Sequence, residues 1–112
     1  PDNNMEKSQP QVLSNAQKKF LRKLGHSLSP AVYIGKEGLS DTVILAVEEA
    51  LDAHELIKIK LVNTDKISKH EAADRVPDLT RSQLVQLIGK TLLVYRPNKN
   101  KKKDEQIRLP KS

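Results

Sequence analysis

Two kinds of apolar pattern follow one another along the chain. In some segments apolar residues recur every three or four positions, as in helices; in others they recur every second position or form a continuous run, as in strands. The first helical pattern follows Ser14 and Gln17, whose spacing is that of a capping box, and predicts a helix from about 15 to 27. Its apolar positions are Phe20, Leu21, Leu24 and Leu28. Pro30 prevents the helix from continuing, because proline lacks the N–H that a helix interior needs.

A strand, a glycine-containing loop and a second helix are expected next. Residues 31–34 (AVYI) form a short run with β-branched and aromatic members, which indicates a buried strand that ends at Gly35. Ser40 is a good N-cap, and apolar residues at helical spacing continue to about residue 53. The stretch IGKEGLS, residues 34–40, therefore places two glycines around two charged residues between a strand and a helix.

Residues 56–62 alternate with a period of two, as expected of a half-buried strand. Its apolar face would carry Ile57, Ile59 and Leu61, and its polar face Lys58 and Lys60.

The rest of the chain predicts a short helix, a hairpin and a tail. Ser68 and Glu71 match a capping box and predict a short helix, in which Pro77 falls where another turn would be needed. Strands are expected at 84–88 and 91–95, because the Gly89-Lys90 pair between them suits a two-residue hairpin turn.

The order helix, strand, helix, strand, helix, strand, strand predicts a single compact α/β domain with a mixed four-stranded sheet. A length of 112 residues fits one core of modest size. We expect three parts: a disordered N-terminal segment over 1–12, a folded domain over 13–97 and a flexible basic tail over 98–112.

Positive charge is concentrated on one side of the first predicted helix and at the end of the chain. The net charge is +6, to which residues 1–12 contribute −1, residues 13–96 contribute +3 and residues 97–112 contribute +4. One arc of roughly 140° on the helix, opposite the leucines, holds Lys18, Lys19, Arg22, Lys23 and His26. Many charged helix faces are only solvated, but cations without interleaved carboxylates, in a chain of pI near 9.6, are typical of nucleic-acid binders.

Motifs for catalysis and metal binding are incomplete. The chain has no cysteine, and His54-Glu55 begins an HExxH zinc motif in which Lys58 replaces the second histidine. The segment 84–91 imitates the end of a P-loop, but Leu84 stands at the required first glycine. The sequence therefore favours a protein that is not an enzyme and holds no metal or cofactor.

No apolar run reaches the roughly 20 residues of a membrane span, and the N-terminus lacks the pattern of a signal peptide. We therefore expect a soluble, cytoplasmic protein, and a monomer.

The GxxG loop, Gly35-Lys36-Glu37-Gly38, has the chemistry to hold a sugar-phosphate backbone. Glycines let a ligand approach the main chain without obstruction by Cβ atoms, and the following helix N-terminus offers N–H groups and a positive dipole end. KH domains clamp nucleotides with such a loop. An ordinary strand-to-helix turn also uses glycine, so both interpretations of the motif alone stay open.

Base recognition has little support in the sequence. The aromatic residues are Phe20, Tyr33 and Tyr95, and Phe20 lies on an apolar stripe, so no obvious array for stacking bases exists. We expect recognition of backbone and shape. For Lys58 and Lys60, contact with RNA and a solvated strand face fit the pattern equally well.

Three blocks carry a resemblance to a known family: IGKEGL at 34–39, ALDAHELIKIK at 50–60 and LVQLIGKTLLVYRP at 84–97. Over about residues 13–97 the chain closely resembles the CRM domain (chloroplast RNA splicing and ribosome maturation), in its bacterial stand-alone YhbY-type form. That family usually shows alanine-histidine at Gly25-His26, and a third helix that ends in glycine where this chain has Pro77 and Arg81. A departure is therefore expected at the third helix.

The resemblance implies a fold similar to the C-terminal domain of translation initiation factor three, with a KH-like GxxG loop. It also implies an RNA-binding protein that associates with ribosomal RNA in precursors of the large ribosomal subunit and assists their assembly. The expected RNA-binding residues are Gly35, Lys36, Glu37, Gly38, Lys18, Lys19, Arg22, Lys23, Lys58 and Lys60. The alternative is a protein-binding adaptor that docks on a ribosomal protein or assembly factor without touching RNA.

Overall fold

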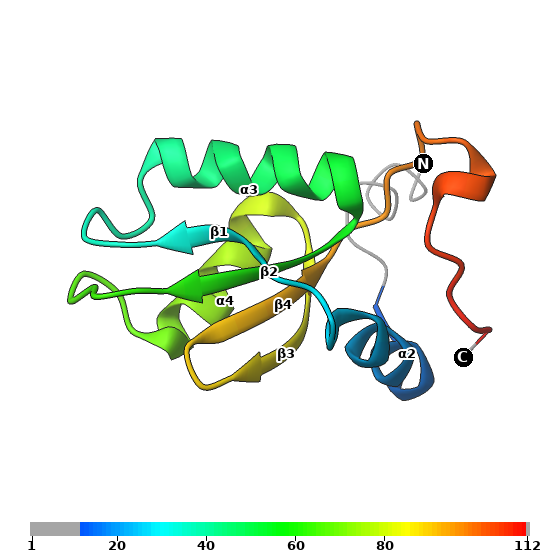
Figure 1. Ribbon diagram of the computed structural model, residues 1–112, viewed down its shortest axis with the longest axis horizontal. Coiled ribbons are helices and arrows are strands. Elements are labelled where there is room, and N and C mark those ends of the chain that lie inside the picture. The colour runs from blue at the N-terminus through cyan, green and yellow to red at the C-terminus, as the bar shows by residue number, and fades with distance from the viewer. Residues whose placement is uncertain (1–11, 112) are drawn as a thin grey trace, which may run out of the picture.

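The computed structural model describes residues 12–111 (Figure 1). Its elements are α2 (Asn15–Gly25), β1 (Pro30–Ile34), α3 (Asp41–His54), β2 (Leu56–Leu61), α4 (Lys69–Thr80), β3 (Gln83–Ile88), β4 (Thr91–Tyr95) and the short 3-10 helix η1 (Lys103–Glu105). The predicted order of helices and strands is confirmed. The N-terminal segment predicted to be disordered lies outside the described residues, except for Val12. No helix in the described part of the chain is both long and apolar enough to cross a membrane.

The four strands form one mixed sheet in the order β1-β2-β4-β3. β1 and β2 are parallel, whereas β4 is antiparallel to both of its neighbours, β2 and β3. The carboxyl ends of β1 and β2 therefore lie at the same edge of the sheet, together with the Gly89-Lys90 turn of the β3–β4 hairpin. Figure 1 shows this edge on the left of the molecule.

One face of the sheet packs against α3 and α4, which lie above and behind it in Figure 1. The strands supply Val32, Ile34, Ile57, Ile59, Leu61, Leu92 and Val94 to this core, and the helices supply Val47, Leu51, Ala72, Ala73 and Val76. The alternating pattern predicted for β2 is confirmed, because Ile57, Ile59 and Leu61 are buried together.

β1 is half-buried and differs in this respect from the buried strand that the sequence predicted. Val32 and Ile34 are buried in the core, whereas Ala31 and Tyr33 point to the other face and are exposed. The reason is the position of β1 at the end of the sheet, beyond the part of that face that α2 covers.

The second face is covered at one end by α2 and by the segment after β4. Leu21 of α2 packs with Leu56, Leu93 and Tyr95, and Ile107 and Leu109 pack against the same cluster. The end of α2 lies very close to the sheet, because a Cβ built on Gly25 would be 2.7 Å from both methyl carbons of Leu93. Glycine at this position thus permits the close packing of helix on strand.

Helix α4 continues past Pro77 to Thr80, so the helix is regular across the position where the sequence left its course open. Proline removes one backbone hydrogen bond, but Val76 and Thr80 on either side of it are fully buried. The hydroxyl of Thr80 donates to the Val76 carbonyl at 2.7 Å. Arg81, with φ +55°, ends the helix in the left-handed conformation that glycine usually adopts there.

The C-terminal segment lies against the domain at Asn98, Ile107 and Pro110, and the flexibility that the sequence predicts for 98–112 stays a prediction. The backbone N–H groups of Asn98 and Ile107 donate to the two carboxylate oxygens of Glu55, at 2.6 and 2.7 Å. Glu55 is only 1% exposed. Gln17 in α2 adds a bond to the Pro110 carbonyl at 3.0 Å. A buried carboxylate therefore holds the segment in place, through contacts about 40 to 50 residues apart in sequence.

Replacing Glu55 with glutamine should loosen the C-terminal segment. Glutamine keeps one acceptor oxygen but places an NH2 group against a backbone N–H, and a hydrogen bond to a charged group contributes roughly 1.5–3 kcal/mol. We expect the free energy of unfolding to fall by about 2 kcal/mol, and trypsin to cleave faster after Lys99 to Lys103, as measured by mass spectrometry. Glu105→Gln, an exposed change in η1, is the control. Equal cleavage rates in the two variants would contradict the assignment.

Candidate nucleic-acid interface

The GxxG sequence forms a tight turn at the end of β1. The N–H of Gly38 donates to the Gly35 carbonyl at 3.0 Å, which closes the turn. Lys36 and Glu37 stand at its tip and are exposed. The loop is therefore presented to solvent with one cation and one anion at its most accessible point.

The two glycines of this turn have different roles. Gly38 is buried with φ +67°, and a Cβ on it would lie 3.0 Å from the Cβ of Lys66. It is therefore required by the turn itself. Gly35 has no such strain, and the nearest atom to a Cβ there would be the Val62 carbonyl oxygen at 3.9 Å. A Cβ at Gly35 would make only an ordinary van der Waals contact, and without it the main chain of this half-buried residue is less covered toward a ligand.

Helix α3 begins directly after the loop. The Ser40 side chain accepts a hydrogen bond from the Val43 N–H at 3.2 Å, which confirms the predicted N-cap and satisfies one of the free donors. The exposed carboxylate of Asp41 occupies the first turn and interacts with the positive end of the dipole. The protein's own groups therefore already interact with part of the helix N-terminus. A phosphate at this site would be bound more by the neighbouring lysines than by the helix N–H groups.

Three loops meet at the edge where β1 and β2 end, and we call this region the loop edge: residues 35–40, 62–68 and 89–90. The Val62 N–H donates to the Ile34 carbonyl at 2.9 Å, and the Leu61 N–H donates to the Lys90 carbonyl at 2.8 Å. These bonds tie the three loops together. A depression of about 240 Å³ between the second and third loops is lined by Leu61, Asn63, Thr64, Ile67, Ser68, Lys69 and Lys90.

The loop edge brings three further lysines to Lys36, and sequence reasoning missed all of them. Lys66, Lys69 and Lys90 are exposed on or beside these loops. The same loops carry the exposed acids Glu37, Asp41 and Asp65, so the positive excess is small. The signal that could have found these lysines is the parallel pairing of β1 and β2, since it places the loop after each strand at one edge.

The basic residues of α2 lie at the other end of β1. Lys19, Lys23 and His26 are exposed, and Lys18 and Arg22 are half-buried. In Figure 1 the helix lies at the lower right, whereas the GxxG loop lies at the far left. β1 has five residues and therefore spans about 17 Å at roughly 3.3 Å per residue. One phosphate cannot contact both groups, but a chain of several nucleotides can.

The two lysines on the polar face of β2 differ in their environments. The ammonium group of Lys58 donates to the Leu28 carbonyl at 2.9 Å and to the His26 carbonyl at 3.4 Å. It thereby holds the connection between α2 and β1. Lys60 is exposed. The structure thus gives Lys58 a role in positioning α2 and leaves Lys60 in contact with solvent.

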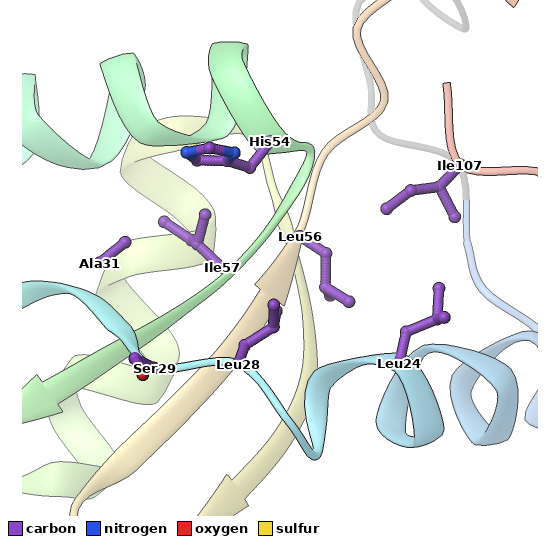
Figure 2. Close-up of a pocket in the computed structure, with 8 residues that line it drawn as sticks. All are labelled: Leu24, Leu28, Ser29, Ala31, His54, Leu56, Ile57 and Ile107. Carbon is purple, nitrogen blue, oxygen red and sulfur yellow. The ribbon is translucent and has the colours of Figure 1, made fainter. Parts of the chain in front are cut away.

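An apolar groove lies beside the end of α2 (Figure 2). Its volume is about 380 Å³, and its lining consists of Leu24, Leu28, Ser29, Ala31, His54, Leu56, Ile57 and Ile107. Figure 2 shows Leu24 and Ile107 on one side of the groove and Ile57 and His54 on the other. Leu24 and Leu28 are 41% and 38% exposed, so the groove presents large apolar side chains to solvent.

Comparison with known proteins identifies relatives over almost the whole described chain. The sequence model of the CRS1 / YhbY (CRM) domain matches residues 13–96. The "Probable RNA-binding protein YqeI" of Bacillus subtilis is 40% identical over 99 residues, which are 88% of this chain and all of the relative. An "RNA-binding protein" of Haemophilus influenzae is 39% identical over 100 residues, covering 89% of this chain and 97% of the relative.

A solved structure has the same fold. The solution structure of the hypothetical protein SAV1595 from Staphylococcus aureus superposes with a TM-score of 0.72 and 36% sequence identity, over 88% of this chain and all of the other. The match of sequence model, relatives and fold agrees with the resemblance carried by the three sequence blocks. The chain therefore belongs to the CRS1 / YhbY (CRM) domain family.

Proposed function

We propose that this protein binds RNA and assists the assembly of the large ribosomal subunit, holding the RNA backbone at the loop edge and along the basic side of α2. Support for RNA binding comes from the family and from relatives that are named RNA-binding proteins. The association with ribosomal precursors rests on what the family resemblance implies. The proposed activity is binding, with no chemical step and no cofactor.

The observation that carries the proposal is the geometry of the GxxG turn. Its tip is exposed, Gly35 has no side chain to cover the main chain, and Lys36, Lys66 and Lys90 lie on the three loops that meet there. A phosphate near Gly35 would meet backbone N–H groups on one side and ammonium groups on the other. Both interactions are charge-assisted and independent of base sequence, as expected for a protein that holds a nucleic-acid backbone.

The separation of the loop edge from α2 sets the size of the ligand. A span of about 17 Å along β1 requires an RNA chain with several phosphates between the two contacts. Each additional phosphate contact strengthens binding and its dependence on salt, because it releases counterions from the RNA. In this proposal the two basic regions bind different phosphates of one RNA molecule.

Reversing the charge of Lys36 should weaken RNA binding and its salt dependence together. Lys36→Glu removes one phosphate contact and adds repulsion, so affinity for a ribosomal RNA fragment should fall several-fold, and the slope of log affinity against log salt should become shallower by about 1. Lys99→Glu makes the same charge change beyond the opposite end of the sheet and is the control. An affinity and slope equal to those of the control would refute the role of the loop.

Alanine at the two loop glycines should separate folding from binding. Gly38→Ala places an L-residue at φ +67° against Lys66 and should lower the free energy of unfolding by about 1–2 kcal/mol. Gly35→Ala adds a Cβ that makes an ordinary contact with the Val62 carbonyl oxygen at 3.9 Å, so the variant should leave urea unfolding unchanged. It should still weaken RNA binding, because its Cβ stands where the phosphate approaches the main chain. Wild-type affinity in a stable Gly35→Ala protein would show that no close approach occurs there.

The groove beside α2 favours a second candidate function, that of an adaptor that binds a ribosomal protein or assembly factor. Its apolar lining and the exposure of Leu24 and Leu28 suit a protein side chain better than a phosphate. In this case, association with ribosomal precursors should survive ribonuclease treatment and be lost in Leu24→Gln or Leu28→Gln. Loss of association after ribonuclease treatment of the wild-type protein would exclude the adaptor function.

A further inference from the structure

The sheet face opposite α3 and α4 is only partly covered. α2 and the C-terminal segment pack over Leu56, Leu93 and Tyr95, at the end of the face far from the loop edge. Near the loop edge, one residue from each strand lines up across the same face. These four residues, which we call the open row, are Tyr33, Lys60, Thr91 and Ile88. Neighbours in the row are partners in the sheet, so they follow one another at intervals of about 4.8 Å.

The open row exposes side chains that are usually buried. Tyr33 is 56% exposed and Ile88 is 62% exposed, whereas Tyr95 is 4% exposed. The chain has three aromatic residues, all within the described part, and Tyr33 is the one that faces solvent. An exposed aromatic ring beside an exposed lysine on a flat strand surface is an arrangement that accepts stacked bases.

The open row is continuous with the loop edge. Tyr33 precedes Gly35 by two residues, and Ile88 and Thr91 flank the Gly89-Lys90 turn. Phosphates held at the loop edge would thus have their bases directed over the row. Lys60 within the row, and Lys36, Lys66 and Lys90 along its margin, give this surface the charge that suits a polyanion.

A shallow depression borders the row on the side of α2. It has a volume of about 180 Å³ and is lined by Lys58, Gln86, Ile88, Thr91 and Leu93. The Gln86 amide and the Thr91 hydroxyl can each donate and accept a hydrogen bond. The Lys58 ammonium group already donates to the Leu28 and His26 carbonyls, so Gln86 and Thr91 are the polar groups left to meet the edge of a base, over the apolar side chains of Ile88 and Leu93.

We propose that the open row binds an unpaired stretch of RNA, with one base stacked on Tyr33 and the next directed toward Gln86 and Thr91. The inference rests on the proposed function and makes it more specific. It selects unpaired RNA, since the faces of bases in a duplex are covered by their neighbours and cannot meet Tyr33.

The first test compares an unpaired ribosomal RNA oligonucleotide with the same sequence in a duplex, using the full chain and fluorescence polarisation. Tyr33→Thr keeps a strand-forming residue but removes the ring, and affinity for the unpaired RNA should fall about tenfold. Tyr33→Phe should bind within twofold of wild type. Leu45→Gln, which removes an exposed apolar side chain from α3 on the other side of the sheet, is the control and should bind within twofold of wild type. Urea unfolding verifies that each variant is folded.

Salt titration separates failure of this inference from failure of the proposed function. Lys36→Glu should weaken binding to both RNAs and change the salt slope, whereas Tyr33→Thr should affect the unpaired RNA and leave the slope unchanged. Wild-type affinity in Tyr33→Thr would overturn the stacking site and leave RNA binding intact. A wild-type protein that binds neither RNA would overturn both. A Tyr33→Thr protein that binds RNA normally but loses a ribonuclease-resistant protein partner would make the row a protein interface and overturn the inference.

Tyrosine emission supplies a second readout. The chain has no tryptophan, and its other tyrosine is buried; burial, with a smaller effect of the negative charge of Glu55, raises the pKa of Tyr95 to about 12. Unpaired RNA should quench the emission of Tyr33 in the wild-type protein. Tyr33→Phe should bind with the same affinity but without this quenching. Unchanged wild-type emission at saturating RNA would show that no base stacks on Tyr33.

Discussion

The parallel pairing of β1 with β2 is the constraint on which the candidate interface depends. Val32 pairs with Ile59 and Ile34 with Leu61, and the Val62 N–H extends the ladder to the Ile34 carbonyl. Parallel strands end at the same edge, so the loops that follow them leave the sheet side by side. This pairing brings Lys66 against the GxxG turn, so a Cβ on Gly38 would lie 3.0 Å from the Cβ of Lys66, in addition to the strain that its φ of +67° imposes on any L-residue. An antiparallel pair would have placed the two loops at opposite ends of the sheet.

Local chemistry made most of the fold predictable from sequence. The capping box at Ser14 and Gln17 is present with both of its hydrogen bonds, and the N-caps at Ser40 and Ser68 are also formed. Each of these signals acts over three or four residues and needs no knowledge of the tertiary structure. Two features that the sequence did not show, the continuation of α4 past Pro77 and the contacts of the C-terminal segment, have long-range causes. Burial of Val76 and Thr80 offsets the backbone hydrogen bond that Pro77 removes, and the distant carboxylate of Glu55 holds the C-terminal segment.

The candidate interface was predictable only where a local signal in the sequence marks it. Glycine spacing located an exposed turn between a strand and a helix, and the turn is present. The lysines around it were not found, because the strand register that gathers them is not visible in sequence. The exposure of Tyr33 was missed too. The run AVYI looks uniformly apolar, and only the place of β1 at the end of the sheet shows that its second face meets solvent.

Net charge alone overstates how much positive charge is available to a ligand. The guanidinium of Arg96 binds the carboxylates of Glu48 and Asp52, and the ammonium groups of Lys58 and Lys101 donate to main-chain carbonyls of the domain itself. These cations connect elements of the fold. Exposed lysines form two groups: one at the loop edge, on α2 and at Lys60 between them, and one on the C-terminal segment at Lys99, Lys102, Lys103 and Lys111. The lysines of the first group follow one path across the sheet, and a path of that shape suits a single extended polyanion better than a compact anion.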